Sequence, residues 1–238
     1  MLSFMNEISI LETKFLIDNE NVTLDIETNE LEITCKNNCE IFFSRHPNNL
    51  NLKIIMMDSS KLLINNFFIY KEETHLQINI DQESNSNLEY RLVGVAQNQV
   101  TIDLKNNING NNNQSKIIIR FLSEDDGQMN INVEGQVLPK VTNNVINEEV
   151  KILSLNNLDN QINPNVLISS DDTVAIHNAT IGGINPLDLF YLESKGLSKK
   201  ASINLIKNGF LLKGLKLNKK LITKIKKKLL EGSEGNGY

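Results

Sequence analysis

The strongest indications of the fold lie in residues 166–210, VLISSDDTVAIHNATIGGINPLDLFYLESKGLSKKASINLIKNGF. Asp171-Asp172 predicts a polar turn, followed by a strand that ends near a lone histidine, His177, just before a turn at Gly182-Gly183. From Asn185 onward the apolar residues recur at helical spacing instead of alternating. The stretch therefore predicts a β region that gives way to helices.

The helix boundaries carry specific signals. Asn185 is a good N-cap, Pro186 suits the first helical position, and Gly196 is expected to end the first helix as a C′ residue. Ser198 is expected to cap a second helix, which Gly209 would end. The apolar face of this second helix is expected to comprise Ala201, Leu205 and Ile206.

A third helix is expected to begin at Asn218, and it belongs to a strongly basic segment. Its apolar side would comprise Leu221, Ile222, Ile225, Leu229 and Leu230. Residues 194–230 contain 12 Lys and no Asp or Glu, although the whole chain has a net charge of −5. Such a segment is typical of a docking surface for an acidic partner or of a nucleic-acid or membrane patch, but equally of a solvated helix face. Residues 232–238 are expected to form a disordered tail.

The chain from Leu31 to Ile176 reads as many short strands separated by polar turns. Apolar and polar residues alternate in several segments, for example at Leu76, Ile78 and Ile80. The turns are rich in Asn and Gly, which tolerate positive φ. The strand spacing fits either a β-sandwich or a β-solenoid. The abundance of Asn favours the solenoid, because stacked Asn side chains form ladders between successive rungs.

The composition restricts the class of protein. No apolar run approaches the roughly 18 residues of a membrane-spanning helix. The first residues lack the basic region and cleavage site of a secretory signal, and two cysteines give no disulfide framework. We therefore expect a cytoplasmic protein without a membrane partner. Nucleic acid is not expected as a partner either, because the body is acidic and the basic segment lacks interleaved aromatic residues.

Nucleotide binding and catalysis find no support in the sequence. The chain contains no G-x-x-x-x-G-K-[ST] loop and no Gly-rich turn of the Rossmann type, so we expect it not to bind ATP itself. No Ser-His-Asp or Cys-His arrangement is evident, and Asp171-Asp172 is interpreted as a turn and cap pair. The sequence predicts a protein that is not an enzyme.

Two motifs contain residues that can bind iron. Cys35 and Cys39 form a C-x3-C pair to which His46 could add a third ligand. However, a cluster normally needs about four ligands, and a cysteine in an apolar strand is often simply buried. His177 is isolated, and an isolated histidine is more often structural than a ligand, although neutral imidazole binds iron well. His177 is the first metal-binding candidate, and the two cysteines are the second.

Three groups of residues resemble the C-terminal part of the SufB/SufD family, the scaffold proteins of the SUF iron–sulfur cluster assembly machinery. The first comprises Pro164–Ile168, Asp171–Val174 and His177–Gly182, which are similar to the family's P-x-L-x-I, D-D-V and H-G-A-T-I-G elements. The second is LFYL at 189–192, followed by SKGLS at 194–198. The third is the segment from Ala201 to Phe210. The sequence that follows the histidine is more similar to that of SufD than to that of SufB.

This resemblance implies a right-handed parallel β-helix followed by a small C-terminal helical domain. It implies that the helical domain docks on SufC, an ABC-type ATPase subunit, and that the β-helices of two SufB/SufD-type chains pair side by side. His177 would then lie at the paired interface, where a transient iron–sulfur cluster forms. The residues that would dock the ATPase subunit are Leu189, Phe190, Tyr191, Ala201, Leu205 and Phe210.

The resemblance divides the chain into residues 1–184, a β-helix scaffold with an irregular N-terminal part, residues 185–231, the docking domain, and the tail. Asn178 and Lys195 depart from the family's usual Gly and Arg. Two functions remain open: a scaffold that pairs with a SufB-like chain and docks SufC, and a homodimeric adaptor that regulates an ABC-type ATPase without binding a cluster. The sequence leaves flavin binding open.

Overall fold

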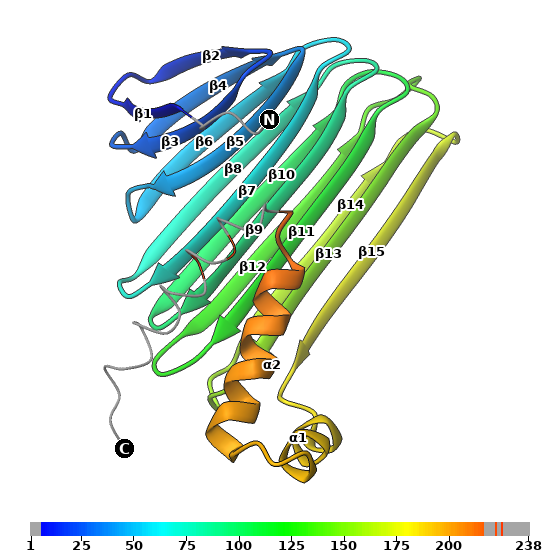
Figure 1. Cartoon of the computed structure of the whole chain (residues 1–238). Helices are drawn as coiled ribbons and strands as arrows, with labels where there is room; N and C mark the ends of the chain where they lie inside the picture. Colours follow the sequence, from blue (N-terminus) through cyan, green and yellow to red (C-terminus); the bar gives the residue numbers. More distant parts are fainter. Residues whose placement is uncertain (1–5, 217–221, 223–224, 226–238) are drawn as a thin grey trace.

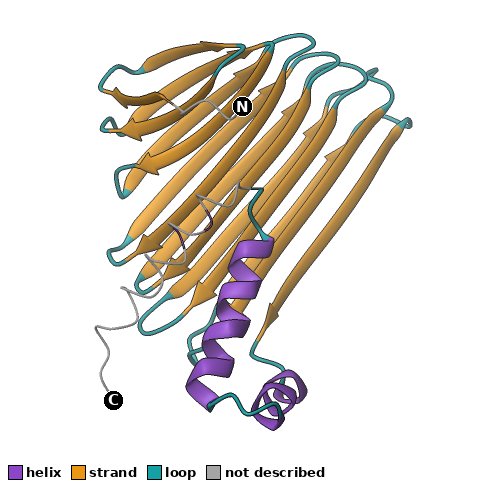
Figure 2. Cartoon of the chain, in the orientation of Figure 1, coloured by secondary structure: helices purple, strands orange, loops and turns teal. Residues whose placement is uncertain are grey.

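The computed structural model describes residues 6–216 together with Ile222 and Ile225. Figures 1 and 2 show a stack of parallel strands with two C-terminal helices, one of which lies against a face of the stack. The strands are β1 (Asn6–Ile10), β2 (Lys14–Asp18), β3 (Asn21–Ile26), β4 (Glu30–Lys36), β5 (Asn38–Arg45), β6 (Asn49–Met56), β7 (Lys61–Tyr70), β8 (Thr74–Gln82), β9 (Asn87–Ala96), β10 (Gln99–Ile108), β11 (Gln114–Ser123), β12 (Gln128–Val137), β13 (Asn144–Ser154), β14 (Gln161–Ile168) and β15 (Thr173–Gly182). The helices are α1 (Pro186–Ser194) and α2 (Lys199–Lys213).

The strands form two parallel sheets, and a rung of the solenoid combines one strand from each sheet. The odd-numbered strands β1 to β15 make an eight-stranded sheet, here called sheet A, and the even-numbered strands β2 to β14 make a seven-stranded sheet, sheet B. Consecutive strands therefore alternate between the sheets, and each strand pairs with the strand two positions along the chain. This is a parallel β-solenoid followed by C-terminal helices, as the resemblance implies, and the sandwich alternative is excluded.

One elongated core fills the space between the two sheets. Alternation with period two points every second side chain inward, as in β10, where Val100, Ile102 and Leu104 are buried. The strands lengthen from 5 residues in β1 and β2 to 10 in β9 through β12, so the solenoid widens along the chain (Figure 1). Because the rungs differ in length, the sequence carries no strict repeat.

Asparagine supports the turns in the way the sequence suggests. Asn85, Asn112 and Asn143 occupy equivalent turns of successive rungs with φ of 60°, 59° and 57°. This left-handed region suits Asn better than most residues. Asn112 donates a side-chain hydrogen bond to Asn85, and Asn143 donates one to Asn112. The Asn ladder is therefore present, and it fixes the spacing of three rungs.

The helix starts are placed as expected. The Asn185 side chain accepts a hydrogen bond from the Leu187 amide, and Pro186 occupies the first turn of α1. Gly196 follows α1 with φ of 91°, a conformation that favours glycine, and Ser198 caps α2 through the Ala201 amide.

The expected end of the second helix is wrong. α2 passes through Gly209 and ends at Lys213, with Gly214 as its C-cap. The cause is tertiary packing. Leu211 and Leu212 extend a second apolar cluster on the outer face of sheet A, together with Phe67 and Val95, and burying these side chains stabilises the last turn of the helix.

The C-terminal segment is only partly described. Ile222 and Ile225 are helical, and Ile225 is buried in the same outer cluster, in agreement with the apolar side expected for a third helix. The other residues of that helix and the tail at 232–238 lie outside the described residues. Within the described part of the chain, no helix has the length and apolar character needed to cross a membrane.

Candidate functional site

Within the described residues, the last rung of the solenoid has two unpaired strand edges. β14 and β15 are the terminal strands of sheets B and A at the same end of the stack, and Figure 1 shows both outer edges open. Every residue of these strands is exposed or half-buried, whereas about every second residue of β12 and β13 is buried. Unpaired edges with free amide and carbonyl groups are templates for pairing with another chain.

The interior of this rung is apolar apart from one residue. Register with β13 places Ala175, His177, Ala179 and Ile181 on the inward side of β15, in line with Ile146, Glu148, Val150 and Ile152. His177 therefore lies in the middle of a ten-residue strand, and the expectation that the strand ends near it is wrong. Ile181 and, on β14, Ile168 are 44% and 43% exposed, because no further rung covers them in the described chain.

Glu148 is the inward neighbour of His177. The Glu148 side chain is only 2% exposed, and its Oε2 lies 3.3 Å from Nδ1 of His177, whose side chain is 25% exposed. Within the described residues, neither carboxylate oxygen of Glu148 accepts a hydrogen bond. Burial raises the pKa of the Glu148 carboxyl to about 7, because the charged form loses its hydration.

Gly135 in β12 makes room for this carboxylate. A Cβ atom at Gly135 would lie 2.9 Å from Oε1 of Glu148, so the acidic side chain reaches from sheet A across the core to sheet B. Neither residue was predicted from the sequence. The available signals were a glycine within a strand and a charged residue in the alternating series Ile146, Glu148, Val150.

The cysteine pair lies far from this end. Cys35 and Cys39 belong to β4 and β5, and both are buried in the core. A hydrogen bond between the thiols, with burial, raises the pKa of Cys35, and the same hydrogen bond lowers the pKa of Cys39 to about 7. His46 packs edge-on against Phe68 instead. In the described chain, no group of three or more His, Cys, Asp or Glu side chains is placed to hold a metal.

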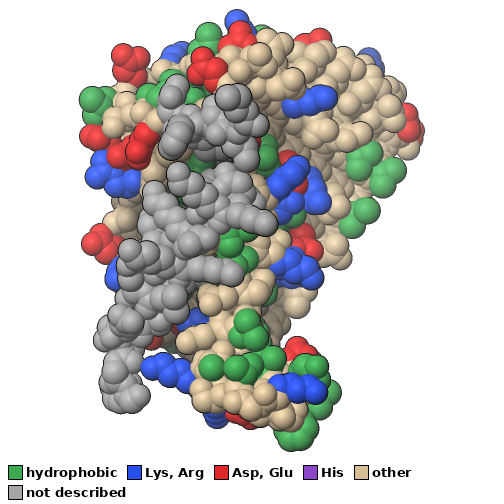
Figure 3. Space-filling view, viewed as in Figure 1, with side chains coloured by type: hydrophobic (Ala, Val, Ile, Leu, Met, Phe, Trp, Pro, Cys, Tyr) green, Lys and Arg blue, Asp and Glu red, His purple; other side chains and the backbone are tan. Residues whose placement is uncertain are grey.

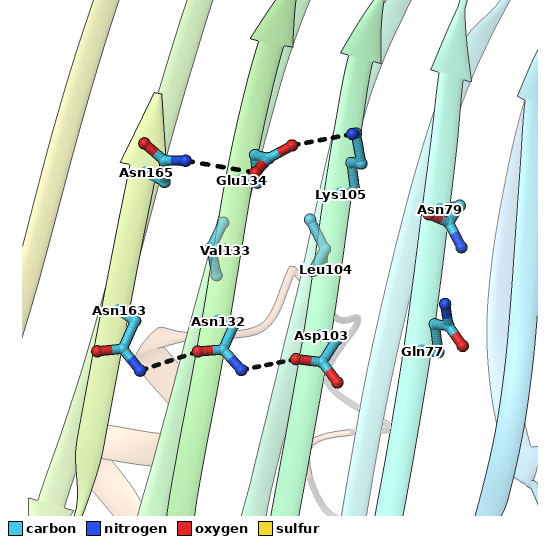
Figure 4. Close-up of a pocket in the computed structure, with 10 residues that line it drawn as sticks. All are labelled: Gln77, Asn79, Asp103, Leu104, Lys105, Asn132, Val133, Glu134, Asn163 and Asn165. Atoms are coloured by element: carbon cyan, nitrogen blue, oxygen red, sulfur yellow. Dashed lines mark hydrogen bonds and ion pairs between the residues drawn. The ribbon is translucent and has the colours of Figure 1, made fainter. Parts of the chain in front are cut away.

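The outer face of sheet B carries an open polar groove (Figure 4). Its side chains satisfy one another in two rows that run across the strands. Asn163 donates to Asn132, and Asn132 donates to Asp103. Asn165 and Lys105 both contact Glu134. These rows stabilise the stacking of the rungs, and we assign them a structural role.

The helix α1 presents an exposed apolar patch, here called the α1 patch. Leu187 is 74% exposed, Phe190 70% and Tyr191 59%, and Figure 3 shows hydrophobic side chains gathered over this helix. Leu189 is half-buried. Large aromatic side chains that remain exposed together are typical of a protein–protein contact surface.

The docking candidates of α2 fall into two groups. Ala201 and Leu205 are exposed, so they are available to a partner. Phe210 is half-buried and faces sheet A, where the Arg120 guanidinium lies 5.7 Å from the ring centroid. The structure therefore brings Phe190, Tyr191 and Leu205 to the surface but places Phe210 between α2 and the β-solenoid.

These features define a class of protein: a parallel β-solenoid with an open final rung, an inward-facing histidine and a helical appendage with an apolar surface. Residues 46–210 match the family described as SUF system FeS cluster assembly, SufBD core domain. Because the match covers more than half of the 238 residues, the chain belongs to this family.

One curated relative indicates which branch of the family the chain resembles. A stretch of 49 residues is 43% identical to the iron-sulfur cluster assembly protein SufD of Bacillus subtilis (strain 168). This stretch covers 21% of the chain and 11% of the relative, so the chain matches only a small part of that protein. The similarity favours the SufD side of the family.

Proposed function

We propose that this chain is a non-enzymatic scaffold subunit of a SUF-type iron–sulfur cluster assembly complex. The observation that carries the proposal is the final rung, where two unpaired strand edges flank the inward-facing His177. A partner that pairs with these edges encloses His177 in a new interior. The iron–sulfur cluster forms there transiently, as cargo of the complex.

The partner pairs by extending the two sheets. Main-chain hydrogen bonds to β14 and β15 give affinity, and the exposed Ile168 and Ile181 are buried by the new rung. A SufB-like chain and a second copy of this chain both offer such edges. The resemblance supports a SufB-like partner.

The partner also supplies the thiolates. Cys35 and Cys39 are in β4 and β5, whereas His177 is in β15, and four strands of sheet A separate β5 from β15. A cluster at His177 therefore takes no thiolate from this chain. This distance supports a shared site, because thiolates are the usual ligands of iron–sulfur clusters.

A SufC-like ABC ATPase docks on the helical appendage. The α1 patch and the adjoining Leu205 provide the apolar surface for this contact. ATP is bound by that subunit, since this chain has no phosphate-binding loop.

Replacing His177 by alanine tests the proposal. A reconstituted complex of this variant with a SufB-like chain and a SufC-like ATPase is expected to lose most of its cluster formation. Cluster formation is measured by visible absorption and by iron and sulfide content. His75→Ala is the matched control, because His75 lies on the outer face of sheet B and pairs with Asp103. Its complex is expected to form clusters as the wild type does.

A homodimeric adaptor that regulates the ATPase without binding a cluster is the second candidate. The same two strand edges favour it, because they allow two copies of the chain to pair with each other. Normal cluster formation by the His177→Ala complex, with normal binding of the ATPase subunit, would select this second function.

A further inference from the structure

Glu148 is an unusual residue for the interior of a β-solenoid. Among the described residues it is the only acidic side chain in the buried set. The row that it belongs to in sheet A contains Tyr90 and Ile117 before it and His177 after it. Buried carboxylates are normally paired with charges or satisfied by several hydrogen bonds. Among the described residues, the one polar partner of the Glu148 carboxylate is His177.

The separation of the two ligand atoms fits a shared cation. Oε2 of Glu148 and Nδ1 of His177 lie 3.3 Å apart. Two oxygen or nitrogen ligands that each lie about 2.1 Å from one ion are about 3.0 Å apart in octahedral geometry and about 3.4 Å apart in tetrahedral geometry. The observed distance lies between these values. An ion that binds both atoms needs little side-chain movement.

We propose that Glu148 is a second iron ligand beside His177, so that this chain binds ferrous iron through one carboxylate oxygen and one imidazole nitrogen. The inference rests on the proposed function, since it takes the final rung as the assembly site. It extends that function by assigning a residue to iron capture. Water occupies the remaining coordination positions until sulfide and partner thiolates replace it.

The chemistry of the donors is compatible with ferrous iron. One carboxylate and one imidazole, with open positions for further ligands, suit Fe²⁺, whereas Mg²⁺ prefers oxygen ligands alone. No thiolate of this chain is near, since both cysteines lie in β4 and β5. The pair is therefore suited to iron before sulfide arrives. The 25% exposure of the His177 side chain lets the ion enter from the open end.

Metal titration of the full chain without partners tests the inference. Binding of Fe²⁺ is measured by anaerobic equilibrium dialysis, and Co²⁺ serves as a visible-absorption probe. We expect one ion per chain and at least a tenfold loss of affinity in both Glu148→Gln and His177→Ala. Glu134→Gln and His75→Ala, whose side chains lie on the outer face of sheet B, are expected to bind as the wild type does.

Thermal unfolding separates a ligand from a structural ion pair. Without metal, Glu148→Gln is expected to melt at the same temperature as the wild type or higher, because an unsatisfied buried charge is removed. Added Co²⁺ is expected to raise the melting temperature of the wild type but not of Glu148→Gln. A lower melting temperature of the metal-free variant, with unchanged Co²⁺ affinity, would show a structural pair and overturn the inference.

The inference and the proposed function fail separately. Absence of stoichiometric Fe²⁺ and Co²⁺ binding by the wild-type chain would overturn the ligand role of Glu148. The loss of cluster formation in the His177→Ala complex would still support the scaffold. Equal losses of affinity in the variants and in both controls would also overturn the ligand role, because the site would then not be specific.

Discussion

The guanidinium of Arg120 lies over the ring of Phe210, 5.7 Å from its centroid, and its Nη1 donates a 3.4 Å hydrogen bond to the Phe210 carbonyl. One strand away, Nη1 of Arg91 donates a 2.8 Å hydrogen bond to the carbonyl of Gly214. These two side chains, here called the arginine clasp, hold the end of α2 on sheet A. A force applied to the helices by a docked subunit therefore reaches the β-solenoid through the clasp.

Removing Arg120 is expected to loosen α2. Arg120→Ala loses the contact with Phe210 and leaves Glu149 without one of its two cationic partners, at a cost of about 2–3 kcal/mol. Hydrogen exchange of the amides at 199–213 is expected to accelerate. Lys116 is an exposed residue on the same strand, and Lys116→Ala is the control. This variant is expected to change neither the stability nor the amide exchange of residues 199–213. Unaltered exchange in Arg120→Ala would show that the clasp does not hold α2.

The clasp is expected to open in acid. Burial opposes ionisation of Glu89 and Glu149, but hydrogen bonds from Lys216 and Arg91 to Glu89, and from Lys151 and Arg120 to Glu149, lower the pKa of both carboxyls overall. A lowered carboxyl pKa gives stability that is complete above the ordinary value of 4.5 and is lost as pH falls through the lowered pKa.

Limited proteolysis of α2 at a series of pH values measures this effect. Cleavage within 199–213 is expected to stay slow from pH 7 to about pH 5 and to rise at lower pH. A double variant, Glu89→Gln with Glu149→Gln, is expected to show rapid cleavage at every pH. Wild-type cleavage that does not depend on pH would be inconsistent with the two ion pairs.

A side chain at Gly135 is expected to displace the Glu148 carboxylate. Gly135→Ala places a methyl group 2.9 Å from Oε1 of Glu148, and because this oxygen is the far end of a flexible side chain, the expected cost is about 1 kcal/mol of unfolding free energy or less. Gly182→Ala, where no atom lies within 4 Å, is the matched control and is expected to be neutral. Combining Gly135→Ala with Glu148→Ala is expected to cost less than the sum of the single changes. Additive costs in denaturant titrations would contradict the contact.

The α1 patch is expected to contribute to binding and not to folding. Phe190→Ala and Tyr191→Ala are each expected to lower the affinity of the chain for a SufC-like ATPase by at least tenfold. The affinity is measured by calorimetry, and the loss is expected because exposed aromatic side chains become buried at the interface. Their melting temperatures are expected to stay close to the wild-type value. Leu11→Ala, an apolar residue that is 72% exposed at the other end of the solenoid, is the control. Wild-type affinity in both aromatic variants would exclude this surface.

Local signals in the sequence predicted the elements whose structure depends on neighbouring residues. The caps at Asn185 and Ser198 and the break at Gly196 are examples, because each acts within one helical turn. The helix end that was predicted at Gly209 is wrong. The local preference of Gly209 is outweighed by Leu211 and Leu212, whose packing partners on sheet A lie far away in the sequence. Tertiary packing of this kind has no local signature.

The candidate site was predicted in part for the same reason. His177 stands out through its resemblance to a family motif, but its partner Glu148 belongs to the previous rung. Only the register of β13 with β15 brings these two residues together, and register is not encoded in either strand alone. The alternation around Glu148 places a charge at an inward position, which is the signal that identifies it once the strand is known.

We propose that the open final rung and the α1 patch are the two partner-binding surfaces of this chain. Amide hydrogen exchange over the whole chain, free and in a complex with a SufB-like chain and a SufC-like ATPase, tests this proposal. We predict that protection on complex formation concentrates in β14, β15 and α1. Protection confined to β1 and β2, or to the outer face of sheet B, with β14 and β15 still exchanging as in the free chain, would contradict it.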